Sequence, residues 1–370
     1  MSGLTVAVDY GAITRNTRIL LERAGGAGLM AVVKADGYGH GLVETARAAR
    51  AGGASWLGVA QPEEALALRE AGDSGRLLAW LYGTDLPAAA LIAADVDLSV
   101  SSLSNLKAVL AGAKEAGSRA RIHVCVDTGL GREGATPDDL PALLDAVERE
   151  RAAGTIEAVG IWSHLAWADV PGHPTIDDQA EVFRLALELA RERGLGFEVR
   201  HLANSAAALT RPDLRFDLVR PGIALYGLSP VVETDGASFG LAPAMSVTSI
   251  VALVKKVRAG HGVSYGHDYV TDRDTYLGLV PAGYADGVFR SAGGRAEVSI
   301  RGTRYRIAGR VCMDQFVVDL GPLTSVAEGD VVTLIGPDGP TAREWADAAG
   351  TIDYEIVCRF GGLRPKVVAG

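Results

Sequence analysis

The chain has 370 residues, of which 48% are hydrophobic and 22% are charged, and its formal net charge is −9. This composition is typical of a globular protein with room for two domains, or for one barrel with an appendage. The acidic charge argues against a protein built around nucleic acid or an anionic membrane surface, so we expect neither partner.

Three cysteines, Cys125, Cys312 and Cys358, form no CxxC pair. We therefore expect no disulfide framework and no metal site, and a reducing cytoplasm fits this cysteine usage. The first ten residues, MSGLTVAVDY, lack the charged and apolar regions of a signal peptide. No apolar run approaches the ~18 residues that a membrane-spanning helix needs.

Residues 29 to 228 alternate between short apolar segments and stretches with helical spacing. The apolar segments, such as WLGVA and VDLSVSS, are continuous, as expected of parallel strands with both faces buried. Eight strand–helix units within about 200 residues are typical of a TIM barrel. We therefore predict an α/β fold with a (β/α)8 TIM-like barrel over residues 10–230. A doubly wound parallel sheet remains the alternative, because the number of strands does not exclude it.

After residues 229–238 the composition changes, and valine, threonine, tyrosine and glycine become denser. Segments such as SVTSIVALVKKV and DVVTLIG are typical of strands joined by short turns. One helix, TAREWADAAG, interrupts them, and Thr341 and Glu344 have the spacing of a capping box at its start. We predict a β-rich C-terminal domain over residues 231–370, to which residues 1–9 contribute through the segment TVAVD.

Polar residues follow five of the predicted barrel strands, at the end where TIM-barrel active sites lie. The convergence of several polar groups on one rim, rather than any one of them, predicts a site there. Lys34 follows the first strand, Arg132 the fifth and His164 the sixth, His201, Asn204 and Ser205 follow the seventh, and Arg220, Gly222 and Ile223 follow the eighth.

Each of these residues also has a structural interpretation. A lysine at a strand end is usually a solvated charge, and both His164 and His201 fit buried structural histidines. Arg220 fits a buried ion pair, and Ser205 fits the cap of a short helix. These alternatives remain open at the level of the pattern.

Two glycine-containing stretches near the rim differ in what they indicate. GLGREG at 129–134 matches the GxGxxG pattern, but it follows the fifth strand and would place Arg132 against the phosphates of a dinucleotide. A tight turn that directs Arg132 inward is favoured instead. The PGI segment at 221–223 offers backbone N–H groups at the usual phosphate site of this barrel. A phosphate there and a lysine at the first strand suggest pyridoxal 5'-phosphate, held on Lys34 as a Schiff base.

Together these stretches resemble alanine racemase, the fold-type III pyridoxal-phosphate family, over nearly the whole chain. The resemblance is carried, in family order, by AVVKADGYGHG, DTGLGREG, SHLAWAD, HLANSAA, VRPGIALYG, GVSYGHDY, PAGYADG and GRVCMDQFVVDL. It implies an N-terminal barrel, a C-terminal β domain, and a homodimer in which the partner chain completes each site.

The resemblance also implies roles for individual residues. Lys34 would bind the cofactor aldehyde and act as one base, and Tyr265 of the partner chain, bonded to His164, would be the second base. The cofactor would be held by Lys34, Tyr38, His164, Asn204, Ser205, Gly222 and Ile223, with Arg220 at the pyridine nitrogen. Arg132 and the Met313 backbone would hold the substrate carboxylate. Supporting residues would be His201, and Tyr284, Cys312 and Asp314 lining the partner chain's contribution.

The implied reaction is the interconversion of L-alanine and D-alanine by proton transfer at Cα. Removing a proton from one face and delivering one to the other needs two groups on opposite sides, which Lys34 and Tyr265 would supply. Three rivals remain: a racemase of another amino acid, a fold-type III decarboxylase, and a non-catalytic cofactor-binding protein with a single barrel. An acidic residue at the pyridine nitrogen would favour the decarboxylase, and Arg220 opposes it. The long C-terminal portion opposes the carrier.

The chain departs from the family pattern at three places. Cys125 stands where many members carry a lysine, often carbamylated, that orients the arginine of the next motif. A neutral thiol cannot pair with Arg132, so we expect another anion or no partner there, and a carboxylate side chain bonded to Arg132 would contradict this. Trp167 is bulky for its position after His164, and the segment 361–366, with Gly362, differs from the usual ending. These changes leave the preferred substrate open.

Overall fold

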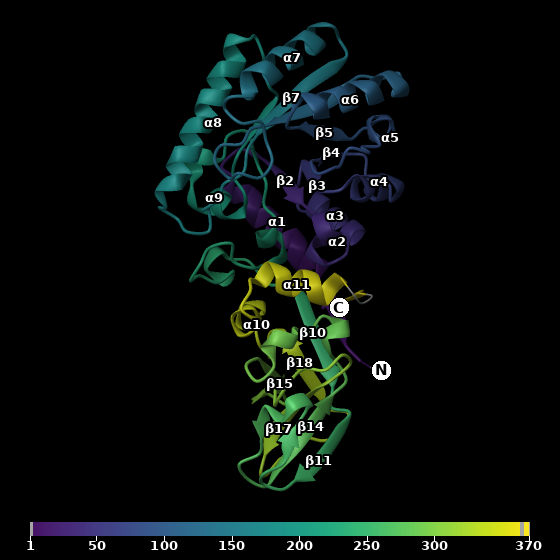
Figure 1. Cartoon of the computed structure of the whole chain (residues 1–370), viewed down its shortest axis with the longest axis vertical. Coiled ribbons are helices and arrows are strands. Elements are labelled where there is room, and N and C mark those ends of the chain that lie inside the picture. The colour runs from purple at the N-terminus through teal and green to yellow at the C-terminus, as the bar shows by residue number, and fades with distance from the viewer. Residues whose placement is uncertain (1–2, 363–365, 370) are drawn as a thin grey trace. The chain divides into compact units, whose positions relative to one another are not determined.

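The computed structural model describes residues 3–362 and 366–369, and these residues form two units (Figure 1). The barrel unit holds residues 11–37 and 42–242. The C-terminal unit holds the described residues of 1–10, 38–41 and 243–370. The division draws a four-residue segment and the N-terminal strand into the C-terminal unit. Each unit is described on its own.

The barrel unit is built on eight parallel strands with buried apolar side chains. In β3 (Trp56–Val59) and β5 (Asp97–Val100) every residue is buried, as the continuous apolar runs predict. The strands lie in the order β8-β7-β6-β5-β4-β3-β2-β9. The others are β2 (Gly28–Val32), β4 (Arg76–Ala79), β6 (Ala120–Cys125), β7 (Ile156–Trp162), β8 (Val199–His201) and β9 (Leu218–Val219).

Backbone hydrogen bonds join the two outer strands of this sheet, β8 and β9. The N–H of Arg220 donates to the carbonyl of Ala203 (2.8 Å), and the N–H of Asp217 donates to the carbonyl of Arg200 (3.1 Å). Asn204 and Arg220 also form a parallel bridge. The sheet therefore closes on itself in chain order, which excludes the doubly wound alternative. The predicted (β/α)8 TIM-like barrel is confirmed.

Helices lie around the outside of the barrel strands (Figure 1). Helix α6 (Leu103–Ala116) begins after Ser102, whose hydroxyl accepts the N–H of Asn105 (3.2 Å), and Gly117 ends it with a φ of 61°. The other helices are α1 (Tyr10–Arg23), α3 (Leu42–Ala51), α4 (Pro62–Glu70), α5 (Ala88–Ala93), α7 (Leu140–Ala152), α8 (Pro174–Glu192) and α9 (Ser205–Thr210), with short 3-10 turns at Pro212–Leu214, Ile223–Tyr226 and Ala237–Phe239.

The C-terminal unit is mainly β-structure in three sheets. Strand β1 (Thr5–Val8) pairs antiparallel with β10 (Met245–Ile250) and parallel with β19 (Lys366–Val368), so the TVAVD segment lies inside the largest sheet. That sheet has the order β16-β15-β18-β10-β1-β19, and the smaller sheets are β11-β14-β17 and β12-β13. The remaining strands are β11 (Leu253–Val257), β12 (Gly262–Val263), β13 (Tyr269–Val270), β14 (Thr275–Val280), β15 (Glu297–Ile300), β16 (Thr303–Arg306), β17 (Phe316–Gly321) and β18 (Val331–Ile335).

Two helices follow the last long strand of this unit, α10 (Ala342–Ala349) and α11 (Asp353–Gly362). The capping box predicted for α10 is confirmed: the Thr341 hydroxyl accepts the N–H of Glu344 (3.1 Å), and the Glu344 carboxylate accepts the N–H of Thr341 (2.6 Å). Trp345 and Phe360 pack edge to face between the two helices. Within the described ranges, no helix is both long and apolar enough to cross a membrane.

Candidate active site

Lys34 stands just beyond the first barrel strand, at the start of a left-handed turn. Strand β2 ends at Val32, and the short segment α2 (Lys34–Tyr38) follows. Its residues 35–37 have φ values between 53° and 61°, and two of them are not glycine. Non-glycine residues rarely adopt this conformation, so the surroundings must hold the turn.

Three contacts within the barrel unit hold this turn. The N–H of Ala35 donates to the Glu64 carboxylate (2.6 Å), and the N–H of Leu42 donates to the Asp36 carboxylate (2.8 Å). A Cβ at Gly37 would lie only 2.7 Å from the Thr45 hydroxyl, so glycine is needed for space as well as for its φ. The turn fixes the backbone of Lys34, whose Nζ lies 6.0 Å from the centre of the Trp80 ring.

Arg220 is buried at the end of β9, and its guanidinium donates only to neutral groups. Its Nη1 donates to the carbonyl of His201 (2.6 Å), and its Nη2 donates to the carbonyl of Ser163 (2.7 Å). The same nitrogens face Nδ1 of His201 and Nδ1 of His164, each at 3.4 Å. Burial lowers the pKa of Arg220 to about 10, which still leaves it charged at neutral pH.

His164 lies among cations at the end of β7. Burial, followed by the charges of Arg220, Arg132 and Lys34, lowers the pKa of His164 to about 3. Its imidazole is therefore neutral at neutral pH. Three cations and one neutral imidazole thus converge on the barrel rim, as the order of the motifs predicts.

Ser205 and the loop after β9 form a second polar group on the barrel. The Ser205 hydroxyl accepts the N–H groups of Gly222 (2.8 Å) and Ala224 (3.4 Å), at the start of the 3-10 turn that Ile223 opens. Asn204, not Ser205, caps α9, because its side chain accepts the N–H of Ala207 (3.1 Å). The helix-cap interpretation of Ser205 is therefore wrong, and the hydroxyl lies where backbone donors gather.

The side chain of Arg132 has a carboxylate partner, contrary to the expectation from the sequence. Both carboxylate oxygens of Glu133 accept hydrogen bonds from Arg132, one from Nε and one from Nη2, the latter at 2.7 Å. Cys125 is buried, and burial and then the charge of Glu133 raise the pKa of its thiol. A neutral thiol beside Arg132 leaves the neighbouring residue in the chain to supply the anion.

Tyr38 belongs to the C-terminal unit, unlike the other residues of the AVVKADGYGHG motif that precede it. Its ring is buried and lies 6.2 Å from the ring of Tyr354 in α11. Burial and then the nearby Tyr354 and Cys358 raise the pKa of the Tyr38 phenol, which keeps it a neutral hydrogen-bond donor. Gly39 packs so closely on Val357 that a Cβ would lie 2.6 Å from its carbonyl oxygen.

Tyr265 opens a tight 3-10 turn of the C-terminal unit (Tyr265–His267), and 70% of its surface is exposed. Ser264, with a φ of 64°, anchors this turn: its hydroxyl donates to the carbonyl of Arg310 (2.7 Å) and lies 3.4 Å from the sulfur of Cys312. The phenol is thus held on a fixed backbone while its ring projects from the unit.

The predicted C-terminal residues lie together around this turn. The N–H of Tyr284 donates to the carbonyl of Cys312 (3.0 Å), and the N–H of Ala285 donates to the carbonyl of Met313 (2.9 Å). Gly283 permits this approach, because a Cβ there would lie 2.1 Å from the Met313 carbonyl oxygen. Met313 is 54% exposed and Asp314 is exposed beside it.

Family models match both parts of the chain. The alanine racemase N-terminal domain matches residues 8–230, and the alanine racemase C-terminal domain matches residues 244–368. The chain belongs to the alanine racemase family. An alanine racemase of Frankia casuarinae is 54% identical over 97% of this chain and 94% of its own length, and one of Mycobacterium avium is 54% identical over 95% and 91%.

Solved structures of alanine racemases have the same fold. The alanine racemase of a D-cycloserine-producing Streptomyces lavendulae has a TM-score of 0.98 and 50% identity, over 100% of this chain and 98% of that one. The alanine racemase of E. faecalis has a TM-score of 0.91 at 36% identity, over 100% of this chain and 98% of that one. The alanine racemase fold thus persists as identity falls.

Several residues of this alanine racemase family member escape a motif-based search. Trp80, Glu133 and Tyr354 contact the predicted site residues, and only Glu133 carries a signal in the sequence, as an acid beside Arg132. Trp167 is partly exposed and stacks on His173, with ring centres 4.2 Å apart. Gly362 is the last residue of α11, and residues 363–365 of the altered ending lie outside the described residues.

Proposed function

We propose that this chain is a pyridoxal-phosphate-dependent alanine racemase that interconverts L-alanine and D-alanine, with Lys34 and Tyr265 as its two bases. Full-length similarity to alanine racemases supports the activity. The observation that carries the proposal is the rim of the barrel, where Lys34, Arg220 and a neutral His164 converge. D-Alanine production in the cytoplasm is part of the same proposal.

The donor groups of the chain fit pyridoxal phosphate. The amine of Lys34 suits its aldehyde and Arg220 suits its ring nitrogen. The hydroxyl of Ser205 accepts two backbone N–H groups and keeps its own hydrogen, which suits the phosphate. We infer that Tyr38 donates to the phosphate as well, with further contacts from Asn204, Gly222 and Ile223. When bound, the cofactor withdraws electrons from the substrate and makes the hydrogen on Cα acidic.

Arg220 opposes the decarboxylase alternative. Its two terminal nitrogens donate to carbonyls and face imidazoles, so it meets a bound ring as a permanent hydrogen-bond donor. A guanidinium has no lone pair to take a proton, and with a pKa of about 10 it does not give one up at neutral pH. We infer that Arg220 would not protonate the nitrogen of a bound ring, which would restrain electron withdrawal and disfavour transamination.

Lys34 and Tyr265 would act on opposite faces of the substrate. In one direction the Lys34 amine takes the proton from Cα, and the Tyr265 phenol delivers its own to the other face. The reverse direction exchanges the two roles. An unperturbed phenol has a pKa of about 10, so Tyr265 needs cations nearby to act as a base. The cluster of Lys34, Arg132 and Arg220 around His164 supplies them.

His164 is suited to orient that phenol. Because Arg220 is a donor facing Nδ1 of His164, the proton of the neutral ring belongs on Nε2. We propose that this N–H donates to the oxygen of Tyr265 from a second copy of the chain. The exposed phenol of Tyr265 supports this, because a second copy of the chain can bring it within the hydrogen-bond reach of the substrate that a base needs. The active form would then be a homodimer with shared sites.

Arg132 and the backbone of Met313 would bind the substrate carboxylate. Glu133 engages the Nε–Nη2 edge of Arg132 and fixes the plane of the guanidinium. Bidentate recognition of a carboxylate depends on such orientation. We also propose that the two units correspond to functional domains over residues 10–230 and 231–370.

The test uses the purified protein loaded with pyridoxal phosphate in heavy water. Either alanine enantiomer should acquire deuterium at Cα and convert to the other without release of carbon dioxide. The variant K34A should lose the absorbance of the bound cofactor and all conversion, whereas K107A, at an exposed lysine of α6, should retain both. Carbon dioxide release would favour the decarboxylase, and faster conversion of another amino acid would favour a different racemase.

A further inference from the structure

A series of buried polar side chains crosses the interior of the barrel from Asp97 to Arg220. Nε2 of His123 lies 3.2 Å from the carboxylate of Asp97, and Nδ1 of His123 lies 2.8 Å from Nε2 of His201. Nδ1 of His201 lies 3.4 Å from Nη1 of Arg220. Three members lie on strands, Asp97 on β5, His123 on β6 and His201 on β8, and Arg220 directly follows β9. All four side chains are buried, and we call these four residues the relay.

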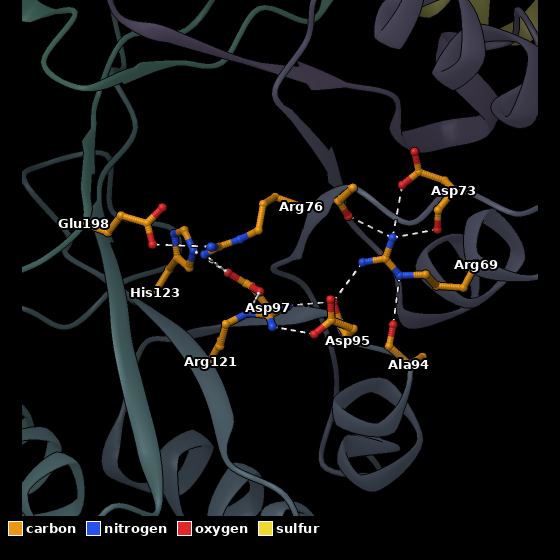
Figure 2. A network of polar contacts seen from close by, with 10 residues as sticks. Arg69, Asp73, Arg76, Ala94, Asp95, Asp97, Arg121, His123 and Glu198 are labelled. Carbon is orange, nitrogen blue, oxygen red and sulfur yellow. Dashed lines mark hydrogen bonds and ion pairs between the residues drawn. The ribbon is translucent and has the colours of Figure 1, made fainter.

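Asp97 is held as a carboxylate at one end of this series of side chains. Arg121 donates to it from Nε (2.5 Å) and Arg76 from Nη2 (3.1 Å), and Figure 2 shows these groups converging on Asp97 beside His123. Burial raises the pKa of Asp97, but the hydrogen bond from His123 and the charges of Arg121 and Arg76 outweigh it and lower the pKa below its usual value.

Asp97 and Arg220, at the two ends of this series of side chains, determine the direction of every hydrogen bond between them. A carboxylate only accepts and a guanidinium only donates. His123 must therefore donate from Nε2 to Asp97, and His201 must accept at Nδ1 from Arg220. One proton remains for the contact between the rings, and it lies on Nε2 of His201. A protonated His123 would force a proton onto Nδ1 of His201, opposite the donor of Arg220.

Close packing holds both imidazole rings in place. Gly160 of β7 lies opposite His123 in the strand register, and a Cβ there would come within 2.2 Å of Nδ1 of His123. Trp162 stacks on the His201 ring with an interplanar angle of 4° and also lies under Arg220, at 4.9 Å. Gly160 therefore leaves room for the His123 ring beside β7, and Trp162 holds the His201 ring and the guanidinium of Arg220.

We infer that Asp97 and His123 are positioning residues for the reaction proposed above: through His201 they hold Arg220 as a fixed donor toward the cofactor ring. The inference rests on the proposed function for its catalytic meaning, while the tautomers of the two histidines follow from the contacts alone. Buried His201 agrees with this arrangement, because burial and then His123 and Arg220 lower its pKa well below the usual value and keep it neutral.

The decisive measurement is nitrogen NMR of the cofactor-loaded protein with labelled histidine rings. The wild type should have bare Nδ1 and protonated Nε2 on both His123 and His201, assigned by H123Q and H201Q spectra. In D97N the amide can donate to His123, so a second tautomer should appear on both rings. The matched control is D95N: Asp95 pairs with the same Arg121 but lies outside the relay, and asparagine tolerates its φ of 61°.

A second pair of variants keeps the test decisive if D97N does not fold. H123Q retains a donor for Asp97 and an acceptor for His201, whereas H123L retains neither. H123Q should keep the wild-type tautomer of His201, and H123L should not. D97N and H123L should lower kcat by about tenfold with little change in KM, because they displace Arg220 and not the carboxylate site, whereas D95N and H123Q should stay near wild type.

The outcomes separate the inference from the proposed function. A proton on Nδ1 of His201 in the wild type, or unchanged tautomers and kcat in both D97N and H123L, would overturn the relay even if alanine is racemised. The expected tautomers in a protein that does not racemise alanine would overturn the proposed function and, with it, the catalytic role of the relay.

Discussion

The carboxylate of Glu133 pairs with the guanidinium of Arg132, its neighbour in the sequence. Cys125 is buried close by, and because burial raises the pKa of its thiol, it provides no charge for that arginine at neutral pH. Adjacent residues seldom face each other, but here the glycines on both sides have positive φ, 70° at Gly131 and 106° at Gly134, and turn the backbone so that the pair can form. This pair bears directly on the proposed carboxylate site.

Replacing Glu133 by glutamine should weaken the orientation of Arg132. In E133Q we expect the KM for alanine to rise about two- to fivefold with a smaller change in kcat, the size of effect that a partly exposed ion pair supports. Steady-state kinetics of both directions measure this. E148Q, which removes a similar pair with Arg151 on α7, is the control. A lower KM in E133Q would mean that Glu133 competes with the substrate instead.

The thiol of Cys125 should resist modification in the folded protein. It is buried, and its raised pKa keeps it protonated, whereas the thiolate is the reactive form. Mass spectrometry after maleimide treatment should find Cys125 labelled only as the protein unfolds in denaturant. Labelling at the rate of an exposed thiol, without loss of structure, would contradict the burial of this side chain.

The sequence carries the barrel and the order of its rim residues because both follow from local patterns. Continuous apolar segments such as β3 mark strands buried on both faces, and Thr341 with Glu344 marks a helix start. The relay is hidden for a physical reason. Asp97 and His123 sit inside apolar strands, and the partner that satisfies each one lies on another strand.

The left-handed turn after Lys34 could not be predicted from composition. The left-handed conformation is strained at Ala35 and Asp36, which are not glycine. Hydrogen bonds offset this strain: Glu64, distant in the sequence, accepts from Ala35, and Asp36 accepts from the N–H of Leu42. The pairing of Arg132 with Glu133 does not follow from the sequence for a different reason: the turn that brings these neighbours face to face depends on glycine φ angles that the motif does not specify.

Gly37 should tolerate alanine poorly. In G37A the new methyl group would meet Thr45 at 2.7 Å in addition to the cost of positive φ, so we expect a loss of about 2–3 kcal/mol in the free energy of unfolding and weaker cofactor binding. Gly131 has a φ of 70° and open space around it, so G131A should lose only about 1 kcal/mol. Urea unfolding of both variants measures the difference, and equal losses would argue against the close packing on Thr45.

The partly buried His164 should make the protein sensitive to acid. The pKa of His164 in the folded state, about 3, lies below the ordinary value near 6.5. Between pH ~3 and pH ~6.5 this histidine is therefore protonated in the unfolded chain but not in the folded chain. Stability present above pH ~6.5 is therefore lost as the pH falls toward ~3. The stability difference between wild type and H164Q should shrink over this window in denaturant titrations. H261Q, at an exposed histidine, is the control, and a difference that stays constant with pH would contradict a neutral His164.

A shared active site predicts that two inactive chains restore activity when they pair. In a heterodimer of K34A and Y265F, one site lacks both bases, while the other combines the intact Lys34 of one chain with the intact Tyr265 of the other. Random pairing of equal amounts makes half of the dimers mixed, with one working site of two, so the mixture should recover about a quarter of wild-type racemisation.

The comparison that gives this prediction its force is a mixture of K34A with a chain that carries both substitutions. Its heterodimers contain no site with both bases and should recover nothing, although they assemble equally well. Native mass spectrometry confirms that mixed dimers have formed in each sample. If K34A and Y265F form mixed dimers without regaining activity, the exposed phenol of Tyr265 does not serve the cofactor of a second copy, and the second proton must come from a group within one chain.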